Sequence, residues 1–348
     1  MIEIDGSRGE GGGQIVRLAV AAAAATGVEL RVVNIRARRQ NPGLAAQHVA
    51  AVSLVAEMCG ARVDGNSVGS STLTFRPGPL KGGDFRADVG TAGSIPLVLQ
   101  SAMLAAAFAP SEVSLRVTGG TDVRRSPSAD YIINVLSPLL AKMGVGAEVQ
   151  TVRRGHYPRG GGEMRALIRP AKPSAFRVEG AGRLEALGGR AHVVGLPADI
   201  ARRMRESALK EVQSLPAPVK VEEEVVAGGD PGAGITMWAR TEHSVLGACA
   251  LGERGLRAEN VGALAGRELV LELRSQASVD VHAADQILPY MALGGGGAFT
   301  VRSVSSHLET GMRVLEALSG VRFRAERKYG LMRVECLPPR GREPARQL

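Results

Sequence analysis

The stretch "AFTVRSVSSHLETGMRVLEALSG", residues 298–320, combines a strand pattern and a helix pattern in one continuous segment. Its first seven residues alternate apolar and polar side chains, which is typical of a half-buried strand. Met312, Leu315 and Leu318 then follow at helical spacing, and Gly320 supplies a stop signal. We therefore expect a strand that leads directly into a helix, as in an α/β fold.

A single histidine stands at the point where this strand is expected to become a helix. Ser305 and Ser306 are good N-cap residues, so His307 is expected at the helix N-terminus. Free N–H groups and the helix dipole attract anions there, and they would lower the pKa of the imidazole. A neutral imidazole beside an anion site suits attack on a phosphate. Taken alone, the stretch favours the simpler alternative of an ordinary capping or surface histidine.

The same order of elements occurs three times along the chain. Helix, strand, helix and two short strands are expected from residue 11, again from residue 91, and again from residue 278. Each copy would pack two helices against a small sheet. We expect an α/β large domain with repeats 1 and 2 over 1–183 and repeat 3 over 278–337. An inserted α/β subdomain is expected over 184–277, and a flexible tail over 338–348.

Composition favours a soluble protein of a reducing compartment, with a cytoplasmic location. The three cysteines lie far apart, at positions 59, 249 and 336, with no spacing typical of disulfides or zinc sites. The N-terminus lacks the pattern of a signal peptide. The most apolar stretch, residues 94–109, is too short and too polar to span a bilayer, so no membrane partner is expected.

The chain is strongly basic, with 43 Lys and Arg residues against 34 Asp and Glu residues and a formal net charge of +9. Only six of the basic residues are lysines, which leaves 37 arginines. Arginine binds phosphate at two points, so a nucleic-acid partner fits this composition, as would coding bias or heat adaptation. Aromatic residues make up 3% of the chain, too few for the stacking surface of a single-strand-binding module.

The loop "DGSRGEGGGQIVR", residues 5–17, carries glycines into the start of a helix. Glycines let a backbone approach a phosphate closely, and Arg17 lies about one helical turn away. Glu10 could hold a divalent metal or act as a base. The alternative is a tight turn with an exposed carboxylate. No Walker sequence occurs in the chain.

Two further loops are basic. Arg36, Arg38 and Arg39 follow a predicted strand, and they form either a phosphate clamp or a solvated loop. The string "RRGHYPRGGGE", residues 153–163, leaves the same two interpretations open.

A polar pair lies on the predicted helix that precedes the strand leading to His307. Asp285 and Gln286, in "HAADQ", could bind a ribose hydroxyl, although a surface pair would look the same. The loops and His307 each stand at the edge of a repeated unit, which favours one shared phosphate site.

In combination, these stretches resemble the RNA 3′-terminal phosphate cyclase family over about residues 1–336, and the subdomain matches most loosely. The string Arg-Gly-x-x-Pro-x-Gly-Gly-Gly at 154–162 is close to a family fingerprint. Arg38 stands where the family typically has glycine, and His282 stands where an aromatic residue is often found. The matching strings are "DGSRGEGGGQIVR", "IRARRQNPGLAAQH", "GTAGS" followed by Gln100, "GGTDV", "RGHYPRGGG", "DQILPYMAL" and "SSHLETG".

The resemblance implies a ligase that performs nucleotidyl transfer in three steps. His307 would attack the α-phosphate of ATP and form a covalent histidine-AMP, with release of pyrophosphate. The AMP would pass to the 3′-terminal phosphate of an RNA. The neighbouring 2′-hydroxyl would then displace AMP and close a 2′,3′-cyclic phosphate. ATP is the expected co-substrate, and a divalent cation, Mg²⁺ or Mn²⁺, is the expected cofactor.

The resemblance also assigns roles to individual residues. His307 and Glu10 are expected to be catalytic, and Glu10 is the expected metal ligand. ATP contacts are expected from Gln100, Pro127, His282, Ala283, Ala284, Asp285 and Gln286. Contacts with phosphate or RNA are expected from Arg17, Arg36 and Arg39. Residues 184–277 carry no candidate chemistry, so the subdomain is expected to guide RNA.

Three competing functions remain. A non-catalytic cyclase-like scaffold in ribosomal RNA processing would share the fold, but such relatives lack the nucleophilic histidine. An enolpyruvyl transferase has similarly repeated α/β units and would not need the His307 loop. A plain RNA-binding module would explain the charge but not the "HAADQ" helix. The sequence leaves open the physiological RNA, the preferred metal and the oligomeric state.

Overall fold

The computed structural model describes residues 1–339. The expected flexible tail over 338–348 therefore lies almost entirely outside the described residues. Within that range, the chain forms four four-stranded sheets flanked by helices, and the predicted α/β class is confirmed.

Three of the sheets share one pairing pattern. In each, the first two strands pair in parallel, and the other two pairings are antiparallel. The first sheet is β1 (Ile2–Asp5), β2 (Leu30–Val33), β4 (Leu73–Arg76) and β3 (Arg62–Asp64) in spatial order. The second is β5 (Gly83–Asp88), β6 (Val113–Gly119), β8 (Gly162–Arg169) and β7 (Gly146–Arg153). The third is β9 (Phe176–Val178), β14 (Gly297–Val301), β16 (Leu331–Leu337) and β15 (Arg322–Lys328).

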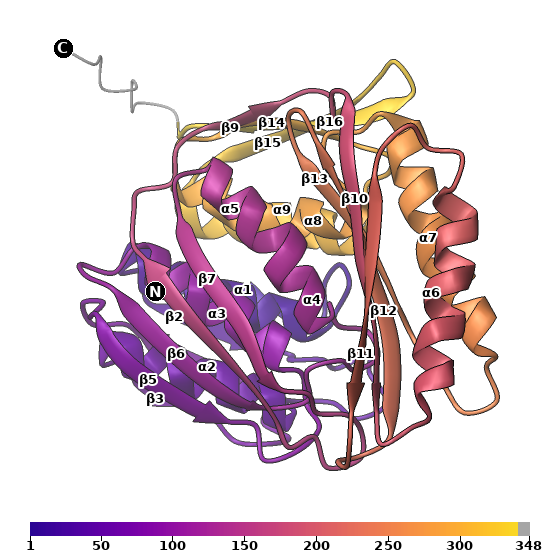
Figure 1. The fold of residues 1–348 in the computed structure, drawn as a ribbon. Coiled ribbons are helices and arrows are strands. Elements are labelled where there is room, and N and C mark those ends of the chain that lie inside the picture. Colours follow the sequence, from indigo (N-terminus) through magenta and orange to yellow (C-terminus); the bar gives the residue numbers. More distant parts are fainter. Residues whose placement is uncertain (340–348) are drawn as a thin grey trace.

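The helices that accompany these sheets gather in the middle of the molecule (Figure 1). They are α1 (Gly13–Thr26), α2 (Ala46–Cys59), α3 (Ile95–Ala107), α8 (Val281–Leu293), α9 (Ser306–Ser319) and a composite helix over 129–142. Eight of the fourteen residues of the alanine-rich α1 are buried, and the helix contacts α2, α3, α8 and α9. The axis of a central helix must lie near several neighbours at once, and small side chains allow this close approach.

The composite helix contains a π-helical turn that the sequence did not predict. It consists of α4 (Ala129–Tyr131), the π-helix η1 (Ile132–Leu136) and α5 (Ser137–Lys142). Pro138 lacks a backbone N–H, so the regular hydrogen-bond pattern cannot continue through it. The carbonyl of Ile132 accepts the backbone N–H of Ser137, five residues further on, and also the Ser137 hydroxyl at 2.9 Å. Widened turns of this kind are frequent at functional sites.

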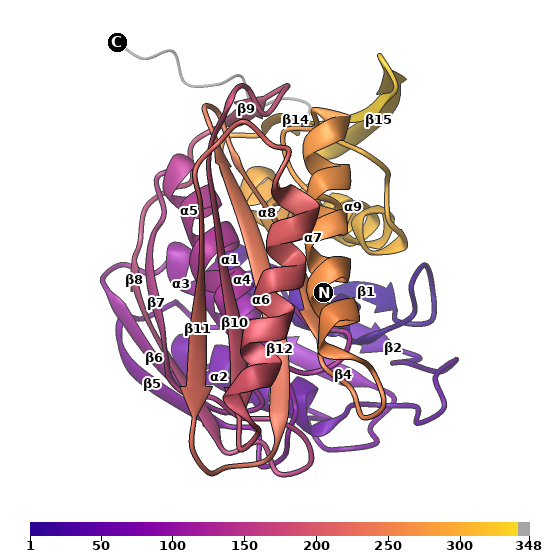
Figure 2. The same cartoon turned by 45° about the vertical axis from the view of Figure 1, so that its right-hand side comes forward.

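The fourth sheet belongs to the segment between β9 and α8. Its strands are β11 (Val219–Val226), β10 (Leu184–Val194), β12 (Gly232–Thr241) and β13 (Val245–Leu251) in spatial order. Helices α6 (Ala198–Val212) and α7 (Ala258–Ser275) pack against each other on its outer face (Figure 2). This segment has its own hydrophobic cluster, with core residues between Ala181 and Leu273.

Candidate active site

His307 lies in the first turn of α9, at the start of a capped helix. The Ser305 hydroxyl accepts a hydrogen bond from the Leu308 N–H at 3.1 Å, so Ser305 is the N-cap residue. The helix ends at Gly320, which adopts a left-handed conformation with φ of 71°. The imidazole itself is exposed, next to the N-terminal part of α1.

The side-chain amide of Gln14 determines which nitrogen of His307 carries the proton. Its Nε2 donates to Asp285 Oδ2 at 3.1 Å and to the His307 carbonyl at 3.2 Å. The Gln14 Oε1 atom therefore faces His307 Nδ1, at 2.9 Å. An amide oxygen only accepts, so this network assigns the proton to Nδ1. The lone pair of Nε2 is then free to act as a nucleophile.

The surroundings also favour the neutral form of the imidazole. Partial removal from water lowers the pKa of His307, and the positive charges of Arg17 and Arg39 lower it further. The sequence predicted this direction, but it attributed the effect to the helix terminus. Partial removal from water and two arginines, brought together from distant segments, act in the same direction.

A cavity of about 380 Å³ opens beside His307. This volume is suited to a small-molecule ligand. A narrower apolar recess of about 50 Å³ adjoins it and shares five of its residues, including Arg17 and Gln100. The cavity is lined by Gln14, Arg17, Leu97, Gln100, Arg125, Ser126, Pro127, Tyr131, Cys249, His282, Asp285, Gln286 and His307.

Several polar groups that face this cavity have no protein partner among the described residues. Gln100 Nε2 and Gln286 Oε1 are buried and lack a hydrogen bond. The half-buried guanidinium of Arg17 makes no hydrogen bond or ion pair with any described residue. Burying such groups unpaired is unfavourable, so a polar, anionic ligand would satisfy them. Burial lowers the pKa of Arg17 to about 10, which leaves it charged at neutral pH.

Asp285 adds a carboxyl group whose charge depends on pH. Burial raises its pKa to about 7, and the nearby Asp280 adds to this effect while Arg17 opposes it. A group that titrates near neutrality inside a cleft is typical of functional sites.

Glu10 lies close to α9 but is engaged by an arginine. Its backbone N–H donates to the Thr310 hydroxyl at 2.9 Å, and its carboxylate forms an ion pair with Arg39. One carboxylate oxygen, Oε2, is buried and has no partner in the described structure. Mg²⁺ is commonly held by one or two carboxylates together with substrate phosphates and water. A carboxylate oxygen without a protein partner, close to α9, is therefore compatible with such an ion.

Some of the predicted site residues lie away from the cavity. Arg36 turns back onto its own loop and donates to the Gly43 carbonyl at 2.7 Å, and Arg38 is exposed. Only Arg39 of this group reaches the surroundings of His307. Ala283 and Ala284 are fully buried in the hydrophobic core and do not line the cavity.

The structure also reveals contributors that sequence reasoning missed. Asp280 is the N-cap residue of α8, and its carboxylate accepts from Tyr131 Oη at 2.7 Å and from the Gly247 N–H at 2.9 Å. An Asp directly before a helical pattern is a cap signal that could have identified it. Cys249, on β13, forms part of the cavity wall. The subdomain thus contributes to the cavity, which was not expected from its sequence.

Comparison with known proteins identifies the family. The family described as RNA 3′-terminal phosphate cyclase matches residues 8–325 of the chain. A protein of that name from Nitrosospira multiformis is 46% identical over 343 residues, which cover 97% of each chain. The chain belongs to the RNA 3′-terminal phosphate cyclase family. A second relative of the same name, from Pyrococcus furiosus, is 43% identical over 331 residues, covering 95% of this chain and 96% of the other.

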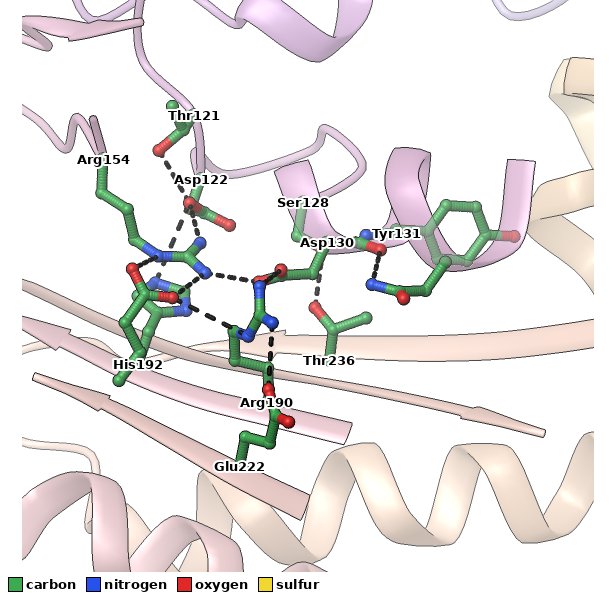
Figure 3. A network of polar contacts seen from close by, with 12 residues as sticks. Thr121, Asp122, Ser128, Asp130, Tyr131, Arg154, Arg190, His192, Glu222 and Thr236 are labelled. Atoms are coloured by element: carbon green, nitrogen blue, oxygen red, sulfur yellow. Dashed lines mark hydrogen bonds and ion pairs between the residues drawn. The ribbon is translucent and has the colours of Figure 1, made fainter. Parts of the chain in front are cut away.

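The string that resembles the cyclase fingerprint, residues 154–162, lies outside the cavity lining. Arg154, its first residue, is buried and binds three carboxylates: Asp122 at 3.0 Å, Asp130 at 2.6 Å and Glu224 at 2.7 Å (Figure 3). Glu224 lies on β11 of the fourth sheet, so this arginine links that sheet to the end of β7 in the second sheet. Removing one member of a buried, well-paired ion network strongly destabilises the fold, because the remaining charges are left unpaired.

Among the helices of the described residues, none has the length and apolarity that crossing a membrane requires.

Proposed function

We propose that the protein is an enzyme that converts the 3′-terminal phosphate of an RNA into a 2′,3′-cyclic phosphate, with consumption of ATP. Membership of the cyclase family supports the reaction class. The observation that carries the mechanism is the free Nε2 of His307 beside a cavity that contains the unpartnered guanidinium of Arg17.

In the first step, the lone pair of His307 Nε2 attacks the α-phosphorus of ATP. An N–P bond forms, the bond to the bridging oxygen of the β-phosphate breaks, and pyrophosphate leaves. The Gln14 amide holds the ring by Nδ1, so the nucleophile is oriented before ATP binds. Arg17 neutralises phosphate charge as the fifth ligand of phosphorus enters. We assign further ATP contacts to Gln100, Asp285 and Gln286, and the surroundings of the base to Pro127 and His282.

In the second step, an oxygen of the RNA 3′-phosphate attacks the AMP phosphorus, and His307 leaves. In the third step, the 2′-hydroxyl attacks the 3′-phosphorus, loses its proton, and AMP departs. The products are the cyclic phosphate, AMP and pyrophosphate. Arg36 and Arg39 stay our candidates for contacts with RNA phosphates. Arg39 is the stronger candidate, because it reaches the surroundings of His307 whereas Arg36 binds its own loop.

Glu10 would hold a divalent cation, Mg²⁺ or Mn²⁺, through its free Oε2. The ion would supply charge neutralisation at the phosphates. A cytoplasmic location stays a prediction.

We also propose that the three sheets with a common pairing pattern are copies of one unit. In this proposal, repeats 1 and 2 occupy 1–183 apart from β9, which pairs in the third sheet and so opens the third copy. The rest of repeat 3 occupies 278–337, and the α/β subdomain over 184–277 is inserted between β9 and that remainder. The separate hydrophobic cluster of the subdomain supports this division.

The test is incubation with ATP labelled at the α-phosphate, followed by denaturing gel analysis. The unaltered protein should acquire a label that is lost in acid and survives alkali, as expected of a histidine phosphoramidate. His307→Asn should acquire none, because asparagine can still occupy a helix N-terminus but cannot form the adduct. His243→Asn, at an exposed histidine of the subdomain, is the matched control and should label normally. A fully labelled His307→Asn protein would refute the mechanism, and an unlabelled native protein would favour the non-catalytic scaffold.

A further inference from the structure

A second cluster of chemically active side chains lies outside the nucleotide cavity. It consists of Asp122, in the loop after β6, His156, in the loop between β7 and β8, and His192, on β10. All three side chains are buried: the exposed fractions are 3%, 5% and 1%. The proposed mechanism uses none of them.

The cluster contains several polar atoms that have no partner in the described structure. Asp122 Oδ2 accepts from the Thr121 hydroxyl at 2.7 Å and from Arg154 at 3.0 Å, which leaves Oδ1 free (Figure 3). His156 Nε2 and both ring nitrogens of His192 also lack hydrogen bonds. Buried polar atoms are rarely left unpaired, and three such residues side by side indicate that something else satisfies them.

The potential ligand atoms converge. One atom from each of the three residues lies within 4.8 Å of the other two, and His192 Nε2 is 3.8 Å from Asp122 Oδ2. The two imidazole rings are stacked, with centroids 5.4 Å apart. Ligands of a tetrahedral zinc ion, at bond lengths of about 2.1 Å, are about 3.4 Å apart. Small side-chain rotations would therefore close the cluster around an ion.

The neighbouring strand leaves room for both imidazoles. His192 pairs directly with Gly234 on β12, and Gly232 lies two residues away on the same face. A Cβ atom at Gly232 would overlap the ring of His156, and one at Gly234 would lie 2.8 Å from His192 Cε1. Any larger residue at either position would displace an imidazole, so these two glycines form a recess for the cluster.

The charges around the cluster favour a cation. Asp122, Asp130 and Glu224 contribute three negative charges, and Arg154 and Arg190 contribute two positive charges. Glu222, at the exposed rim, is balanced by Lys220. With neutral imidazoles the network carries one net negative charge, which a divalent ion would offset.

We propose that Asp122, His156 and His192 form a structural site for a divalent transition-metal ion of borderline hardness, with Zn²⁺ as the best match. Two imidazole nitrogens and one carboxylate oxygen suit Zn²⁺, and a water molecule would complete a four-coordinate shell. The ion would join a loop after β6, a loop after β7 and a strand of the subdomain. Its role would be to fix the subdomain against the large body, independently of the proposed reaction.

The experiment uses full-length protein purified without a histidine tag. The protein is stripped with a chelator, dialysed against Zn²⁺ or Co²⁺, and analysed for bound metal. We expect one equivalent, the visible absorption of tetrahedral Co²⁺, and an unfolding midpoint that rises with added metal. His156→Asn and His192→Asn should each weaken binding at least about 100-fold, because loss of even an outer-shell partner costs about 10- to 100-fold. His243→Asn should bind like the unaltered protein.

Two outcomes would overturn the proposal. A folded native protein that retains no Zn²⁺ or Co²⁺ after dialysis would show that buried water, rather than metal, satisfies the cluster. Binding that survives both substitutions would place the ion elsewhere. If either variant fails to fold, X-ray absorption of the Co²⁺-loaded native protein decides, since the proposal requires two imidazoles in the shell.

Discussion

Replacing Asp285 by asparagine should make the protein more stable while it weakens the nucleotide site. The carboxyl group lies on α8 beside Gln14, whose amide donates to Oδ2 at 3.1 Å. Burial raises its pKa from 3.8 to about 7, despite the opposing charge of Arg17. At pH 8 the folded protein must therefore hold an ionised group in surroundings that disfavour it. Asparagine has nearly the same shape and carries no charge.

The magnitude follows from the pKa difference. Each pKa unit corresponds to about 1.4 kcal/mol, so ionising Asp285 in the folded state at pH 8 costs up to about 4 kcal/mol. The side chain is partly accessible from the cavity, which reduces the effect, and we expect about 2 to 4 kcal/mol. The folded state binds the proton more tightly than the unfolded state. The stabilisation due to that proton is therefore complete below about pH 4 and is lost as the pH rises to about 7.

Urea denaturation at pH 4 and pH 8, without ATP, tests this reasoning. Asp285→Asn should raise the free energy of unfolding at pH 8 and change it little at pH 4. Glu309→Gln, at an exposed carboxylate of α9, controls for the loss of one negative charge. The Asp285→Asn protein should acquire less label from ATP. This is expected where a group that lowers the stability of the fold is required for function. An equal effect at both pH values, or a loss of stability at pH 8, would refute the argument.

Three further predictions concern other parts of the molecule. Gln14→Ala should slow AMP attachment about 100-fold, because the His307 ring loses the group that orients it, and an unchanged labelling rate would contradict this. Asp280→Ala should lower the free energy of unfolding by about 3 to 5 kcal/mol, because Tyr131 Oη, the Gly247 N–H and the start of α8 all lose their acceptor. A loss below about 1 kcal/mol in denaturation experiments would count against that account. RNA affinity should fall steeply with added salt while self-adenylylation falls less, and equal sensitivity in binding and labelling assays would argue against a basic RNA surface.

The features that could be predicted from sequence are those with local signals. The helix that begins near His307 is one example, since Ser305, the apolar spacing and Gly320 all lie within sixteen residues. Arg17 was likewise singled out from a glycine-rich loop that precedes a helix, and the structure places it in the cavity wall. The fold class followed from the alternation of helix and strand patterns.

The features that could not be predicted depend on contacts between distant segments. Gln14 and His307 lie near opposite ends of the sequence, and nothing in the sequence near either residue indicates that their side chains are in contact. The leading strands of the three sheets, β1, β5 and β9, were not predicted, because each buries only one residue and so shows no apolar periodicity. The three arginines at 36–39 have the same local signal, yet loop geometry directs only Arg39 toward Glu10. Side-chain direction in an irregular loop is not encoded by spacing.

The pairing of β9 with β14 has a consequence for how the chain is made. Phe176 lies in register opposite Gly297, so β9 pairs with a strand that is synthesised about 120 residues later. At translation rates of about 5–20 residues per second, β9 waits on the order of 6 to 24 seconds with an unpaired edge. During that interval the first two sheets are complete and the subdomain is still emerging. The nascent protein should therefore depend on chaperones most while residues 180–297 are being translated, since open strand edges promote association between chains.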